Sequence, residues 1–255
     1  MGFAIFGGII VIIEKGVLLK EKHEREIEEN YIAKLVSYEA LDDMVKLMDV
    51  VYEALPNKEV LFVDSYDDLY EDLNKGAKII GIYGEENNLI AFRYVSFPGL
   101  ERRNLGYDLG LPETELHKLC QLETTVVDPP YRGNNIQFMT LSMMKPIIAK
   151  EGYKHMACTI SPYNFYSVNN IMRHGLKIKS LKRKYGTTKD NSDGIWRYIL
   201  HGTLDDNLEL TNNDKINIEM TNIDAQVKLL NNGYIGYKLY HEDQTLDYVR
   251  FSPPY

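Results

Sequence analysis

The sequence has few of the residues that typify several classes of protein. Its 255 residues include two cysteines, Cys120 and Cys158, nine prolines and one tryptophan. Disulfides are not needed for stability at this length, and both cysteines occupy apolar contexts where a free cysteine acts as a small hydrophobic residue. We therefore expect a reducing compartment and predict a cytoplasmic location. Neither the cysteines nor the six histidines have metal-ligand spacing, so no metal site is expected.

An excess of positive charge and a long hydrophobic run are also missing. The formal net charge is −8, which argues against a nucleic-acid partner. The apolar run from Phe3 to Ile13 is too short to cross a bilayer as a helix, and it lacks the flanks of a secretory signal. Its β-branched residues favour a β-hairpin or an extra edge strand. A membrane-surface anchor is the less favoured alternative.

What the chain does contain fits a globular protein with a sizeable core. Hydrophobic residues make up 44% and charged residues 26% of the sequence, as in ordinary folded domains. We expect an N-terminal apolar and charged extension over residues 1–29, whose charged stretch 20–29 connects to a main domain over residues 30–203. Residues 204–255 are expected to form β-hairpins packed on the same domain, because about fifty residues make only a marginal core alone.

Hydrophobic periodicity predicts alternating strands and helices in the main domain. An apolar residue recurs every three or four positions between Leu41 and Leu55, which indicates an amphipathic helix. The mixture of hairpins and crossovers predicts an α/β (α+β) fold with a mixed, mainly antiparallel sheet flanked by helices. Strands are expected at 31–36, 78–83, 89–97, 119–127, 155–160, 176–184 and 196–201, and helices at 41–55, 66–73, 136–150 and 165–174.

The segment from Leu122 to Gln137 indicates chemistry. A buried strand ends, a turn with two prolines follows, and a helix opens just after Arg132 and Gly133. The first turn of a helix has free backbone N–H groups and the positive end of the helix dipole, so it can hold a diphosphate without a metal. Arg132 adds positive charge. The alternative is an ordinary turn without a ligand.

Two motifs in this region resemble those of the GNAT superfamily of N-acetyltransferases. Val127-Asp128-Pro129 and Tyr131-Arg132-Gly133 are similar to the pyrophosphate loop of that family. About thirty residues later, Asn164 begins a helix that ends at His174-Gly175-Leu176, as in the family's second motif. The sequence departs from the family at Asn135 and Gln137, which replace the later glycines of the loop.

The resemblance implies a GNAT-like fold over about 170 residues and direct transfer of an acetyl group from acetyl-CoA to an amine of a small molecule or peptide. Asn164 could also serve only as a helix cap. The residues that the resemblance places beside the cofactor are Val126, Val127, Arg132, Gly133, Asn134, Asn135, Ile136, Gln137, Asn164 and Ser167.

For catalysis, the resemblance favours a carboxylate base that deprotonates the amine through water. Glu123 is the candidate base, although it could equally be an ordinary strand residue or an ion-pair partner. Ile171 replaces the tyrosine that commonly acts as the acid, and Tyr166 is a weak substitute. These departures leave a non-catalytic, regulatory acyl-CoA-binding protein as the alternative function. The acceptor is not identified, and the oligomeric state is open, with a homodimer one option.

A basic run follows the second motif. We expect it to lie on an exposed strand edge, where lysines discourage aggregation. The alternative is attraction of the 3′-phosphate of the cofactor or of an acidic substrate. The run comprises Arg173, Lys177, Lys179, Lys182, Arg183 and Lys184.

Overall fold

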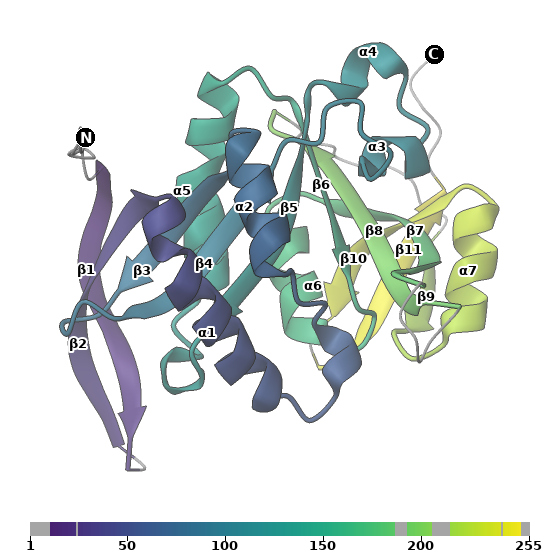
Figure 1. Ribbon diagram of the computed structural model, residues 1–255. Coiled ribbons are helices and arrows are strands. Elements are labelled where there is room, and N and C mark those ends of the chain that lie inside the picture. Colours follow the sequence, from purple (N-terminus) through teal and green to yellow (C-terminus); the bar gives the residue numbers. More distant parts are fainter. Residues whose placement is uncertain (1–10, 24, 187–192, 206–214, 241, 251–255) are drawn as a thin grey trace.

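A single eleven-stranded sheet runs through the computed structural model, which describes residues 11–23, 25–186, 193–205, 215–240 and 242–250 (Figure 1). The strand order is β1-β2-β3-β4-β5-β6-β8-β7-β10-β11-β9, and every pair is antiparallel except β5–β6. The strands are β1 (Val11–Lys22), β2 (Arg25–Val36), β3 (Lys78–Tyr83), β4 (Leu89–Ser96), β5 (Leu119–Val127), β6 (His155–Ile160), β7 (Lys177–Lys184), β8 (Ile195–Thr203), β9 (Lys215–Glu219), β10 (Tyr234–Tyr240) and β11 (Thr245–Arg250).

Helices cover both faces of the sheet (Figure 1). They are α1 (Leu41–Glu53), α2 (Tyr66–Asn74), α3 (Leu105–Asp108), α4 (Glu113–Leu116), α5 (Ile136–Lys150), α6 (Phe165–Arg173) and α7 (Ile223–Asn231), with 3₁₀ turns η1 (Tyr38–Ala40), η2 (Lys58–Val60) and η3 (Pro129–Tyr131). Successive strand side chains point to opposite faces. Accordingly, Ile79 joins the cluster under α1 and α2, and its neighbour Ile80 joins the cluster under α5 and α6.

The predicted fold class, a mixed and mainly antiparallel sheet with flanking helices, is confirmed. The predicted order of elements from β2 to β8 is also confirmed. Sequence periodicity missed the one-turn helices α3 and α4, which are too short to show a repeat. It also missed α7, where only hairpins were expected.

The N-terminal part of the chain differs from the expectation. The charged stretch 20–29, predicted to connect an extension to the main domain, instead forms the end of β1 and the start of β2. The predicted boundary after residue 29 therefore falls inside β2, which pairs with β1 on one side and β3 on the other. Residues 3–10 of the apolar run lie outside the described residues, and residues 11–13 lie in β1, in agreement with the favoured prediction of a β-hairpin or extra edge strand.

The C-terminal segment extends the same sheet. Strand β10 pairs with β7 through Gly236 and Ile178, so β7 lies between β8 and β10. The prediction that the basic run occupies a sheet edge was therefore wrong. Two of its lysines, Lys182 and Lys184, form ion pairs with Asp108 of α3. In the described part of the chain, no helix combines the length and apolar character needed to cross a membrane.

Candidate active site

Strands β5 and β6 diverge, and a cleft opens between them. They pair in parallel only from Leu119↔His155 to Gln121↔Ala157. Beyond that point, β5 pairs only with β4 and β6 only with β8. Ligands in sheets with parallel strands commonly bind where neighbouring strands separate at their carboxyl ends. Here the separation leaves a cavity of about 110 Å³ with residues of both strands in its walls.

The other walls of the cleft come from segments far apart in the sequence. The start of α5 and α6 contributes Gln137, Asn164 and Ser167, and the segment before α2 contributes Phe62 and Asp64. Further lining residues are Arg93 of β4, Ile171 of α6, Tyr185 after β7 and Arg197 of β8. The lining is therefore polar and carries charges of both signs.

The loop between β5 and α5 is shaped as an anion site requires. Gly133 and Asn135 have φ angles of +89° and +58°, in the region that glycine and asparagine tolerate best. The Asn135 side chain does not cap α5; its Oδ1 instead accepts a hydrogen bond from Arg173 at 3.1 Å. The side chain of Asn135, the N-cap residue, therefore makes no hydrogen bond to the backbone amides in the first turn of α5. These amides fit a diphosphate. Ile136 is buried and fixes the start of the helix.

Several residues predicted to contact the cofactor have side chains engaged elsewhere. Asn134 Nδ2 donates to the Leu19 carbonyl at 2.6 Å, and the Leu19 amide donates to Asn134 Oδ1 at 2.8 Å. Asn134 thus ties the loop to β1. Val126 is buried under α1, and Val127 packs on the opposite cluster. Arg132 is exposed beside the hairpin that β1 and β2 form.

At the second motif, Asn164 is confirmed as the N-cap of α6, because its Oδ1 accepts from the Ser167 amide at 3.2 Å. Both residues also line the cleft, so capping and ligand contact are compatible. Gln137 lines the cleft as well, and its Oε1 accepts from Asn170 at 3.0 Å. Tyr166, the suggested acid, is 72% exposed and lies outside the cleft lining.

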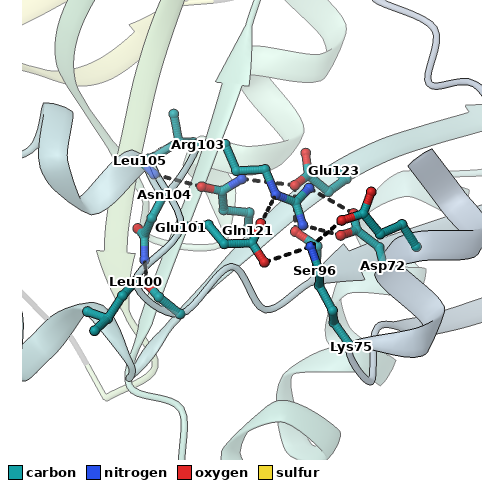
Figure 2. Close-up of polar contacts among 12 residues, drawn as sticks. Asp72, Lys75, Ser96, Leu100, Glu101, Arg103, Asn104, Leu105, Gln121 and Glu123 are labelled. Atoms are coloured by element: carbon teal, nitrogen blue, oxygen red, sulfur yellow. Dashed lines mark hydrogen bonds and ion pairs between the residues drawn. The ribbon is translucent and has the colours of Figure 1, made fainter. Parts of the chain in front are cut away.

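Glu123 projects from β5 into the cleft and is held in place by two donors. Its Oε1 accepts hydrogen bonds from Ser96 Oγ at 2.6 Å and from Gln121 Nε2 at 2.9 Å. Gln121 Oε1 in turn accepts from the Leu105 amide at 2.6 Å. Figure 2 shows this connection from Leu105, the first residue of α3, to Glu123. The carboxylate is therefore oriented by its own strand, by β4 and, through Gln121, by the start of α3.

Asp64 is a second carboxylate in the cleft that sequence reasoning missed. It accepts a hydrogen bond from the Thr124 hydroxyl of β5. Desolvation raises the pKa of Asp64 to about 7, and the nearby charge of Glu123 adds to this effect against the opposing hydrogen bond from Thr124. The only sequence signal at Asp64 is that it directly precedes Ser65, which begins the capping box of α2. The packing of that segment against β5 gives Asp64 its environment.

Tyr185 and Arg93 were also missed. The Tyr185 hydroxyl shares a hydrogen bond of 2.6 Å with Thr159 of β6, and burial raises its pKa to about 12. Tyr185 thus places a phenol in the cleft, whereas position 171, where the resemblance predicts a tyrosine, holds an isoleucine. Arg93 donates to the Gln137 carbonyl at 2.7 Å and to Thr140 at 3.1 Å, which braces the first turn of α5. Burial lowers its pKa to about 10.

The comparisons with known proteins show the fold. No protein-family model matches the chain, and no curated protein matches it. Among solved structures, it is similar to the ribosomal-protein-S18-alanine N-acetyltransferase from Escherichia coli, with 12% identity, a TM-score of 0.51, and coverage of 71% of this chain and 99% of that one. An N-acetyltransferase from Staphylococcus aureus Mu50 gives 14% identity, a TM-score of 0.50, and coverage of 68% and 97%. The chain therefore has the GNAT fold, as its two motifs indicated.

Proposed function

We propose that this chain is an acetyl-CoA-dependent N-acetyltransferase that moves an acetyl group directly to the amine of a small molecule or peptide. The observation that carries the proposal is the position of the cleft. It opens where β5 and β6 diverge, reaches the first turn of α5 through Gln137, and has two carboxylates in its wall. Because the identity to solved structures is low, the similarity supports the fold, and the proposal for the function rests on the residues of the cleft.

The residues of the loop fit the cofactor. The first-turn amides of α5, at Ile136 and Gln137, would bind the diphosphate, with Arg132 adding positive charge from the exposed side. Asn164 and Ser167 would contact the arm that enters the cleft, together with the backbone of Val126 and Val127. Acetyl-CoA supplies the thioester acyl group when bound. Gln137 keeps its Nε2 as a donor, since Asn170 uses only its Oε1.

The chemistry requires a neutral amine, so a proton must be accepted near the acyl carbon. Glu123 is the proposed base, directly or through water, because Ser96 and Gln121 fix one of its oxygens and orient the other. Asp64 shares the cleft, and its pKa of about 7 means that its charge in the same site changes near neutral pH. We assign the proton donor to the leaving thiolate to Tyr185 and not to Tyr166, because Tyr185 lines the cleft.

The alternative is a non-catalytic protein that binds acyl-CoA and acts as a regulator. It is favoured by Ile171, which stands in the cleft where the family commonly has a tyrosine, and by Gln137, which replaces a glycine. Both functions require the cofactor to bind, and only the first requires turnover. The cytoplasmic location and the homodimer stay predictions.

The experiment that tests the proposal measures binding and turnover separately. Isothermal titration with acetyl-CoA should show binding, and release of free thiol in the presence of a panel of amines should show transfer. Glu123→Gln keeps an acceptor for Ser96 but cannot take a proton, so we expect kcat to fall about 10²–10⁴-fold with acetyl-CoA affinity unchanged. Glu86→Gln, in the exposed turn after β3, is the matched control.

The outcomes are distinct. Absence of acetyl-CoA binding at millimolar ligand removes both functions. Binding without turnover of any amine favours the regulatory alternative. Turnover that survives Glu123→Gln at the wild-type rate removes Glu123 as the base.

A further inference from the structure

Arg197 of β8 is a buried cation in the wall of the cleft. The residue is 2% exposed, and within the residues that the structure describes its only hydrogen bond runs from Nη1 to the Trp196 carbonyl at 3.1 Å. Among the described residues, Nη2 has no hydrogen-bond partner, and no carboxylate forms an ion pair with the guanidinium. An arginine is costly to bury with donors unmade, since each unpaired polar group retains its desolvation penalty.

A second atom in the same cleft has the same property. In the described part of the chain, two buried side-chain atoms lack a hydrogen-bond partner, Arg197 Nη2 and Thr125 Oγ1, and both residues line this cleft. Thr125 belongs to β5, so the two atoms come from strands on either side of the cleft. Their presence in one cavity indicates a polar ligand.

The surroundings of Arg197 define the charge of that ligand. Tyr185 packs near its guanidinium, with 5.7 Å between the guanidinium carbon and the ring centre, and Glu59 is the acidic residue that acts on it from a distance. Glu59 is exposed and forms no ion pair with it. A planar guanidinium with free donors matches a carboxylate, to which it can donate two parallel hydrogen bonds.

The carboxylates lie elsewhere in the same cleft. Glu123, Asp64, Tyr185 and Arg197 all line this cleft, and Tyr185 lies beside the Arg197 guanidinium. A ligand that spans them would present an ammonium or amine to the two carboxylates and an anion to Arg197. We propose that the acceptor is an amine that also carries a carboxylate, such as a free amino acid, and that Arg197 binds that carboxylate. This inference rests on the proposed function and narrows its substrate class.

The test compares matched pairs of amines that differ only by a carboxylate: alanine with ethylamine, phenylalanine with phenethylamine, and glutamate with 4-aminobutyrate, which retains one carboxylate. Binding is measured by isothermal titration in the presence of CoA, and transfer is measured as kcat/KM with acetyl-CoA. We expect the carboxylated member of at least one pair to be preferred about 10- to 100-fold, the effect of a hydrogen bond to a charged group.

Variants assign the preference to Arg197. Arg197→Met keeps an unbranched apolar stem and removes the guanidinium and its charge, so it should abolish the preference by raising KM for the carboxylated amine, with acetyl-CoA affinity unchanged. Arg197→Lys should retain part of the preference, since it keeps the charge but not the planar donors. Thermal unfolding of each variant establishes that it is folded, and Lys46→Met on the exposed side of α1 is the control for loss of a cation.

Each outcome decides the inference. If no carboxylated amine binds more tightly than its partner, or if the preference persists in Arg197→Met, the inference is overturned. Transfer to simple amines without any preference would support the proposed acetyl transfer and contradict the binding of a substrate carboxylate by Arg197. Failure of acetyl-CoA to bind, with the carboxylate preference present, would contradict the proposed acetyl transfer and support the carboxylate site. If Arg197→Met does not fold, Arg197→Lys with a wild-type preference for all pairs also contradicts the inference.

Discussion

Asp64 illustrates how burial of one side chain couples stability to activity. Its pKa of about 7 lies above the value of about 3.9 for an aspartate in an unfolded chain. The native state therefore binds more protons than the unfolded state between these values, and stability falls as pH rises from about 4 to about 7. The stability that is lost there is the cost of an ionised carboxylate in the cleft.

The variant Asp64→Asn should remove this dependence. It keeps an oxygen that can accept from Thr124 and removes the charge. We expect the variant to unfold at higher denaturant concentration than the wild type at pH 8, with the difference shrinking towards pH 4. The wild-type profile of kcat/KM should show a rising limb near pH 7 that disappears in the variant. An unchanged limb would mean that a group other than Asp64 causes it.

At the scale of elements, the start of α3 is connected to Glu123, the proposed base, through one side chain. Gln121 is 5% exposed, donates to Glu123 and accepts from the Leu105 amide. The loop before α3 is also fixed at Arg103, which pairs with the buried Asp72 of α2 and with Glu101 (Figure 2). This segment is therefore connected to β5 through Gln121 and to α2 through Asp72.

Gln121→Met should uncouple these parts while keeping the volume of the side chain. The Leu105 amide would be left unsatisfied, which costs roughly 1–3 kcal/mol in free energy of unfolding. Glu123 would lose one of two orienting donors, so we expect kcat to fall about tenfold with little change in acetyl-CoA affinity. Chemical denaturation and steady-state kinetics measure the two effects. A loss of stability without a loss of kcat would show that Ser96 alone positions Glu123.

At the scale of the whole molecule, the C-terminal segment shares the core of the main domain. The hydroxyls of Tyr198 in β8 and Tyr248 in β11 both donate to Oε1 of Gln226 in α7, at 2.6 and 2.7 Å. All three side chains are fully buried. We therefore expect a single cooperative unfolding transition across residues 30–250 rather than separate transitions.

Gln226→Met tests this packing. It leaves two buried tyrosine hydroxyls without their acceptor, and each costs roughly 1–3 kcal/mol. Adding Tyr198→Phe and Tyr248→Phe should recover much of the loss, because replacing both partners by apolar groups is close to neutral. Fluorescence of the single tryptophan, Trp196, and far-ultraviolet circular dichroism should report one midpoint. Two separate midpoints would contradict the shared core.

Much of the fold could be read from local pattern. The predicted elements from β2 to β8 follow from hydrophobic period, because a face that must be buried leaves a repeat in the sequence. The errors occur in the one-turn helices, which are too short to show a repeat, in the N-terminal hairpin, and in α7, although its Ile223, Val227 and Leu230 recur at helical spacing and pack on the core. Strands β1 and β2 are exposed over much of their length. Their charged residues therefore resemble a polar connecting segment, which is what the sequence predicts for residues 20–29.

The sequence by itself determined the features that depend on neighbours along the chain. The turn at Gly133, the left-handed Asn135 and the cap at Asn164 each depend on residues within a few positions along the chain, and local backbone preferences fix them. Only the tertiary structure decided the composition of the cleft. Asp64 enters it from a segment more than a hundred residues before Tyr185 and Arg197, and the burial that shifts the pKa values of these groups exists only after the sheet has assembled.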